Sequence, residues 1–134
     1  MSVGNRNPPF LNKVVWITGA SSGLGEALSY QLSRWGALLI LSARSEDKLI
    51  QVNESLPRNP GSAKVLPLDL EDLESLPRKV DLAMACYGRI DYFISNAGVA
   101  IRDYALNTNL QIDQKLMNKI TLITFITFKL FIKI

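Results

Sequence analysis

The chain has 134 residues, of which 48% are hydrophobic and 20% are charged, a composition typical of one globular domain rather than a disordered segment. Its net charge of +3 comes from three lysines near the carboxyl end, Lys119, Lys129 and Lys133, and no basic stripe alternates with aromatic residues, so we expect no nucleic-acid partner. The absence of histidine excludes His-based catalysis and His-ligated metal sites, and the single cysteine, Cys86, excludes an internal disulfide.

The first part of the chain predicts a lead-in, a strand, a helix and a second strand. Residues 1–12 are polar and hold two prolines, which predicts a flexible segment that is neither a signal peptide nor a membrane anchor. The apolar run at 14–17 predicts a strand buried on both faces. Residues 24–35 then place their apolar side chains on one helical face, and Gly36 predicts the end of that helix. Residues 37–43 predict the second strand.

The pattern continues to alternate between helices and strands. Ser45 is expected to cap a second helix, and Pro77 is expected to end or restart a third one. The predicted elements are a helix at 45–56, a loop at 57–61, a strand at 63–68, a helix at 71–88 and a strand at 90–95. Alternation with short connections predicts the α/β class, with a partial doubly wound, Rossmann-type parallel sheet of about four strands flanked by helices.

The turn between the first strand and the first helix carries three glycines. Gly19 allows the chain to turn tightly, Gly23 lets a pyrophosphate approach the backbone, and Gly25 lets the helix pack closely against the strand. Free N–H groups and the positive end of a helix favour an anion at this position. Any one of these glycines is also compatible with an ordinary turn, but the three together predict a dinucleotide site.

Arg44, after the second strand, bears on the choice between the two nicotinamide dinucleotides. Proteins that prefer NAD place an acidic residue here to bind the ribose 2′-hydroxyl. A guanidinium, with the hydroxyls of Ser21 and Ser22 nearby, favours a 2′-phosphate instead, and therefore NADP over NAD. The alternative is a solvated surface arginine.

Four short motifs follow the predicted strands in order: Thr-Gly-x-x-x-Gly-x-Gly at 18–25, Ser-Ala-Arg at 42–44, Asp-Leu at 69–70 and Asn-Ala-Gly at 96–98. Together they resemble the short-chain dehydrogenase/reductase family over roughly residues 13–117. Within that family, the chain is similar to the membrane-associated branch of 11-beta-hydroxysteroid-dehydrogenase-like proteins and relatives of dehydrogenase/reductase member 7. The resemblance implies that the cofactor-binding residues are Gly19, Ser21, Ser22, Gly23, Leu24, Gly25, Arg44, Asp69, Leu70, Asn96, Ala97 and Gly98.

The resemblance also implies roles for the later motifs. Asp69 would hydrogen-bond near the adenine ring with Leu70 as a neighbouring contact, although Asp69 could equally cap the following helix. Asn96, Ala97 and Gly98 would line the sheet edge beside the nicotinamide ribose, or simply end the strand.

The catalytic residues of the family have no counterpart in this sequence. The family uses a serine and a Tyr-x-x-x-Lys pair, but no tyrosine here is followed by lysine four positions later, so we assign no catalytic residue. The asparagine of the family's next helix aligns with Ile120. We therefore expect residues 13–118 to form a truncated NADP-binding domain and residues 119–134 to form a divergent apolar tail.

Three functions remain open from the sequence. The first is a fragment that binds a nicotinamide dinucleotide without turning over a substrate, and the second is an active oxidoreductase on lipid or steroid-like carbonyls of which this chain is one part. The third is a module that binds a partner or a membrane surface through the apolar tail. Self-association through a sheet edge or that tail is a further expectation. The expected location is the cytoplasm by default, or the endoplasmic reticulum membrane by resemblance.

Overall fold

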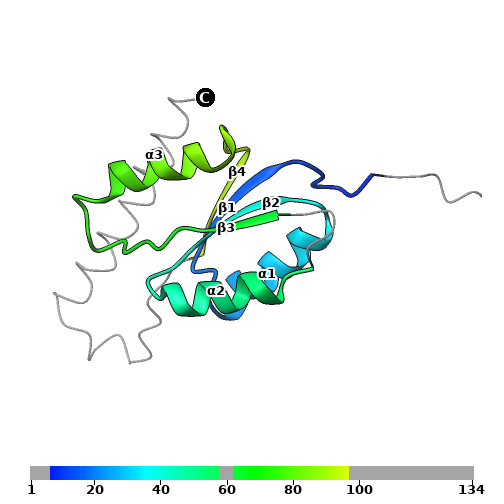
Figure 1. Cartoon of the computed structure of the whole chain (residues 1–134), viewed down its shortest axis with the longest axis horizontal. Coiled ribbons are helices and arrows are strands. Elements are labelled where there is room, and N and C mark those ends of the chain that lie inside the picture. Colours follow the sequence, from blue (N-terminus) through cyan, green and yellow to red (C-terminus); the bar gives the residue numbers. More distant parts are fainter. Residues whose placement is uncertain (1–6, 58–61, 97–134) are drawn as a thin grey trace, which may run out of the picture.

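The computed structural model describes residues 7–57 and 62–96. In chain order, its elements are β1 (Val14–Thr18), α1 (Gly23–Arg34), β2 (Leu38–Ser42), α2 (Glu46–Ser55), β3 (Ser62–Val65), α3 (Leu76–Tyr87) and β4 (Tyr92–Ser95). Within these residues the four strands form one parallel sheet in the order β3-β2-β1-β4 (Figure 1). The predicted α/β class and Rossmann-type parallel sheet are confirmed.

Strand β1 lies between β2 and β4, and helices cover both faces of the sheet. Val14 and Trp16 belong to the core beneath α3, whereas Val15 and Ile17 belong to the core beneath α1 and α2. Figure 1 shows α3 on one side of the sheet and the other two helices on the opposite side. Because successive strand residues point to opposite faces, a strand covered on both must be apolar throughout. This explains the unbroken apolar run that predicts β1.

The third helix begins later than the sequence pattern predicts. We expected a helix over residues 71–88, but α3 begins at Leu76 and Pro77 lies in its first turn. A proline costs little there, because the N–H groups of the first turn have no partner inside the helix. The preceding residues form turns, in which the carbonyl of Asp69 accepts a hydrogen bond from the N–H of Asp72 (3.1 Å).

The chain continues alongside β2 after β3 has ended. The N–H of Leu66 donates to the carbonyl of Leu41 (2.9 Å), and the N–H of Leu68 donates to the carbonyl of Ala43 (2.9 Å). Residues 66–68 are therefore held beside the end of β2, although they are not part of the regular strand that we predicted over 63–68. This pairing brings the next residues, Asp69 and Leu70, to the carboxyl edge of the sheet.

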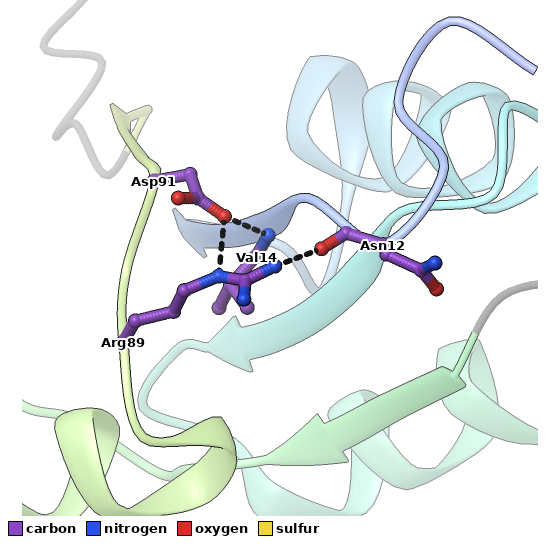
Figure 2. Close-up of polar contacts among 4 residues, drawn as sticks. All are labelled: Asn12, Val14, Arg89 and Asp91. Atoms are coloured by element: carbon purple, nitrogen blue, oxygen red, sulfur yellow. Dashed lines mark hydrogen bonds and ion pairs between the residues drawn. The ribbon is translucent and has the colours of Figure 1, made fainter.

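A polar cluster at the amino end of the sheet joins β4 to β1, and we call it the amino-end clasp (Figure 2). Asp91 Oδ2 accepts hydrogen bonds from the N–H of Val14 (2.8 Å) and from Arg89 Nε (3.1 Å). Arg89 also donates to the carbonyl oxygen of Asn12. Burial alone would raise the pKa of Asp91, but these hydrogen bonds and the nearby positive charges outweigh it, so the pKa lies below its ordinary value.

Residues 8–12, which the sequence places in the lead-in, form turns beside the end of α1. The N–H of Phe10 donates to the carbonyl of Trp35 (3.0 Å), and the two rings stack with centroids 5.7 Å apart. The N–H of Asn12 donates to the carbonyl of Gly36 (3.2 Å). Across the described ranges, no helix is both long and apolar enough to cross a bilayer.

Candidate functional site

A cavity of about 640 Å³ opens at the carboxyl edge of the sheet. The sequence singles out seven of the residues that line it: Gly19, Ser21, Ser22, Arg44, Asp69, Leu70 and Asn96. They come from turns after β1 and β2, from the segment after β3, and from the end of β4. In an open parallel sheet, ligands bind beyond the carboxyl ends of the strands, where neighbouring connections leave in opposite directions. Here β1 pairs with β2 on one side and β4 on the other, so the cavity lies at such a point.

The glycine turn presents the amino end of α1 toward this edge. Gly19 and Gly23 have φ angles of +66° and +57°, values that residues with a Cβ rarely adopt. Ser22 occupies the N-cap position in extended backbone, but its side chain forms no capping hydrogen bond. The N–H groups of the first helical turn have no partner inside the helix, so they and the Ser22 hydroxyl are suited to an anion.

Gly25 is required by close packing and not by its backbone angle. A Cβ at this position would collide with the carbonyl oxygen of Gly19 and would lie 2.7 Å from Nδ2 of Asn96. Asn96 itself bridges β4 to the turn, because its N–H donates to Thr18 Oγ1 (3.1 Å) and its Nδ2 donates to the Gly19 carbonyl (3.3 Å). The helix, the turn and the end of β4 are thereby held together at one wall of the cavity.

The end of β2 and the start of α2 supply positive charge. Arg44 lies directly before Ser45, the N-cap of α2, whose Oγ accepts a hydrogen bond from the N–H of Lys48 (3.5 Å). All three residues line the cavity. In the described part of the chain, no carboxylate lies within ion-pair distance of Arg44 or Lys48. Among these residues, neither cation is engaged in an ion pair.

Asp69 and Leu70 differ in exposure. The Asp69 side chain is exposed, and its Oδ1 accepts a hydrogen bond from the N–H of Glu71 (2.9 Å), which fixes the turn that follows. It does not cap α3, whose N-cap is Ser75, so the alternative role as a helix cap is wrong. Leu70 is buried in the core beneath α3 while it also contributes to the cavity wall.

The remaining predicted residues do not line the cavity. Gly23, Leu24 and Gly25 lie in the turn and first helical residues but outside the lining set, and Leu24 is 66% exposed. A Cβ on Gly23 would meet nothing within 4 Å, so this glycine is needed for its φ angle and not for packing. Ala97 and Gly98 lie outside the described residues.

Six residues that line the cavity are not among the predicted cofactor-binding residues: Thr18, Ser42, Ala43, Ser45, Lys48 and Leu68. Thr18, Ser42 and Ala43 nevertheless belong to motifs that the sequence singles out. Most of the six stand at or just beyond a strand end, and that position was itself the available signal. Ser42 is fully buried, and its Oγ accepts a 2.8 Å hydrogen bond from Trp16 Nε1 across the two strands. Lys48 could have been found as the first basic residue after the α2 N-cap.

The tyrosines that the structure describes do not line the cavity. The Tyr87 hydroxyl donates to the carbonyl of Leu39 (3.2 Å), and burial raises the pKa of Tyr87 although the hydrogen bond with Ser62 opposes this rise. Tyr92 packs edge-on against Phe10 beside the amino-end clasp. Residues 7–57 and 62–96 also contain no group of three His, Cys, Asp or Glu side chains that could hold a metal ion.

The strand order, the glycine turn and the cavity beyond the strand ends define the Rossmann-type class of dinucleotide-binding folds. A family model described as short chain dehydrogenase matches residues 13–133. The chain therefore belongs to the short chain dehydrogenase family, whose members bind a nicotinamide dinucleotide. This match runs through the segment that we set apart as a tail, and the boundary at residue 118 stays a prediction.

Similar proteins support this assignment. A dehydrogenase/reductase SDR family protein 7-like of Anopheles gambiae is 42% identical over 120 residues, which cover 84% of this chain and 37% of the relative. Human dehydrogenase/reductase SDR family member 7 is 42% identical over 109 residues, covering 78% of this chain and 32% of the relative. A metagenomic short-chain oxidoreductase solved in complex with NADP has a TM-score of 0.72 and 27% identity, over 82% of this chain and 50% of that structure. The chain thus spans about a third of the length of these curated relatives.

Proposed function

We propose that the chain binds NADP(H) in the cavity at the carboxyl edge, in preference to NAD(H). The observation that carries this proposal is the placement of Arg44, Ser21 and Ser22 around one cavity, with no acidic residue at the end of β2. An acidic residue there would bind the ribose 2′-hydroxyl of NAD, whereas a guanidinium attracts the 2′-phosphate of NADP. The NADP complex of the metagenomic relative agrees with this proposal.

Each wall of the cavity would hold a different part of the dinucleotide. The N–H groups that open α1 would bind the pyrophosphate, helped by the positive end of the helix dipole. Asp69 and Leu70 would contact the adenine region. Asn96, which two hydrogen bonds fix against the glycine turn, would lie beside the nicotinamide ribose with Ala97 and Gly98. Gly23 and Gly25 would act by shaping the turn, and Leu24 would lie at its rim.

We further propose that this chain does not reduce or oxidise a substrate at the rate usual for the family. A bound nicotinamide ring supplies or accepts a hydride, and the substrate oxygen then needs a group that gives or takes a proton. The residues four positions after the four tyrosines are Arg34, Asp91, Asn96 and Thr108, so none is the lysine of a Tyr-x-x-x-Lys pair.

Titration of the chain with NADPH and NADH, monitored by the fluorescence of the reduced nicotinamide, tests the binding proposal. We expect saturable binding of both, with NADPH bound about tenfold or more tightly, the effect of one charge-assisted contact. A carbonyl-substrate panel in the same samples should show no turnover above background. Equal affinity for the two dinucleotides would contradict the proposed preference for NADP(H). Turnover at a rate ordinary for the family would contradict the proposal that this chain does not turn over a substrate.

A second candidate is an active oxidoreductase on lipid or steroid-like carbonyls, in which this chain is one portion of a longer protein. The observation in its favour is that the aligned regions cover only 37% and 32% of two dehydrogenase/reductase relatives. The intact mass of the native protein distinguishes the two candidates. A protein about the size of this chain, 14.9 kDa, favours binding without turnover, and a much larger one favours the oxidoreductase.

A further inference from the structure

Lys48 is a second cation in the cavity that the motifs of the family do not assign. It lies in the first turn of α2, three residues after the N-cap Ser45, and it lines the same cavity as Arg44. The side chain is exposed, and no carboxylate of the described residues pairs with it. Within the part of the chain that the structure describes, its ammonium group is therefore not committed to an ion pair.

The charges around Lys48 make its position significant. The other two charged residues of this turn, Glu46 and Asp47, are acidic and do not line the cavity. The charged residues that do line it are Arg44, Lys48 and Asp69. Removing the charge of Lys48 would leave Arg44 as the one lining cation of the described residues, beside a helix turn with two carboxylates.

We propose that Lys48 determines dinucleotide specificity, acting with Arg44 as a two-cation clamp on the 2′-phosphate of NADP(H). This inference rests on the proposed function of the cavity. The two side chains suit complementary tasks, because arginine offers a planar fork with fixed donors and lysine offers a compact charge on a flexible stem. A phosphomonoester carries close to two negative charges at neutral pH, so a second cation adds attraction that a 2′-hydroxyl does not receive.

The test compares ligands with and without the 2′-phosphate on the full chain. Dissociation constants are measured for NADPH and NADH by fluorescence titration, and for adenosine 2′,5′-bisphosphate and AMP by competition. The variants are Lys48→Met, which keeps much of the stem length without the charge, and Lys48→Arg, which keeps the charge. Lys79→Met on α3 is the matched control, because it removes one positive charge away from the cavity.

We expect Lys48→Met to raise the dissociation constants of NADPH and adenosine 2′,5′-bisphosphate about tenfold, while those of NADH and AMP change less than about twofold. Lys48→Arg should retain most of the affinity for the phosphorylated pair, and Lys79→Met should change none of the four constants. Far-ultraviolet circular dichroism should be the same for all variants, since Lys48 is exposed and Lys79 is only half-buried.

Two results would overturn the inference, and they are distinguishable from each other. In the first result, the parent chain prefers NADPH, but Lys48→Met leaves that preference unchanged or lowers the affinity for all four ligands equally. Lys48 then does not recognise the 2′-phosphate, although the proposed function stands. If the parent chain binds neither NADPH nor NADH, the proposed function fails and the role of Lys48 fails with it.

Discussion

At Gly25, the space that a methyl group would fill already holds the carbonyl oxygen of Gly19 and the side-chain amide of Asn96. This contact is where α1, the glycine turn and β4 meet. A single added carbon would therefore act on three elements at once, and it would do so at the edge where the cavity opens.

For Gly25→Ala, we expect the free energy of unfolding to fall by about 2 kcal/mol, as for other overpacked sites, and dinucleotide affinity to fall at least tenfold. Gly88→Ala is the control. Gly88 ends α3 with a φ angle of +80° and has open space around it, so alanine there should cost about 1 kcal/mol through backbone strain alone. Urea unfolding and NADPH titration of both variants check this. Equal loss of affinity in the two variants would contradict the packing argument.

Arg44 gives a second prediction at the scale of one residue. Arg44→Asp places an acidic residue where NAD-preferring proteins carry one, so the 2′-phosphate is repelled and the 2′-hydroxyl gains an acceptor. We expect the dissociation constant for NADPH to rise about a hundredfold and that for NADH to change less than about threefold. Fluorescence titrations measure both, and the preference should reverse. If the variant still binds NADPH more tightly than NADH, groups other than Arg44 recognise the 2′-phosphate.

At the scale of elements, the amino-end clasp fixes β4 against β1 at the end of the sheet opposite the cavity. The pKa of Asp91 is lowered in the folded chain, so the folded state holds this proton more weakly than the unfolded state does. The stabilisation from Asp91 is therefore complete above its unfolded pKa, close to 3.8, and is lost as the pH falls through the lower folded value.

Asp91→Asn should remove this contribution while leaving an oxygen that can accept from the N–H of Val14. We expect the free energy of unfolding at pH 7 to fall by about 1 kcal/mol, because one charge-assisted bond and a partly exposed ion pair with Arg89 are weakened. Denaturant unfolding between pH 7 and acidic pH, recorded by circular dichroism, should show a flatter decline near pH 4 and below for the variant. Identical pH profiles for the parent chain and Asp91→Asn would show that the amino-end clasp does not cause the loss of stability at acidic pH.

The sequence predicts most elements of the described residues because their signals are local. Apolar runs bounded by turn residues locate β1 and β2, and Gly36 marks the end of α1 with a φ angle of +85°. The start of α3 is less predictable, since charged residues before Pro77 favour a helix while the turn at Asp69 competes with it. Local preference alone does not decide between those outcomes.

The site is predictable to a smaller extent for a related reason. Motif residues are identified by type and spacing, but membership of the cavity depends on which strand ends adjoin one another in the sheet. Leu68 carries no chemical signal, and it lines the cavity because the segment after β3 pairs with the end of β2. Lys48 resembles any surface lysine until α2 is seen to begin at the cavity.

At the scale of the whole molecule, ligand binding and folding should be coupled. A ligand that binds only the folded chain stabilises it in proportion to the logarithm of its concentration, by about 2.7 kcal/mol at a hundred times the dissociation constant. We expect NADPH to raise the unfolding midpoint more than NADH at the same concentration, measured by thermal melts. The Arg44→Asp variant is the control and should lose the NADPH effect. An unfolding midpoint that does not change when NADPH is added would contradict binding of NADPH to the folded state.

Self-association is the remaining prediction at this scale. Among the described residues, β4 pairs with β1 on one side only, and an unpaired strand edge can receive another chain. Sedimentation velocity over a wide concentration range should show an average mass that rises with concentration. A mass that stays at the monomer value at every concentration would contradict the expected self-association.

The hydrogen bond between Trp16 and Ser42 has an optical consequence. It couples the fully buried indole of Trp16 to Ser42, a fully buried residue that lines the cavity. The emission wavelength of an indole shifts when its N–H changes hydrogen-bond partner. A ligand in the cavity that draws the Ser42 hydroxyl away would therefore change the emission wavelength of Trp16. Trp16 is thus an intrinsic fluorescent probe of the cavity. In a Trp35→Phe variant, it would be the sole source of tryptophan emission.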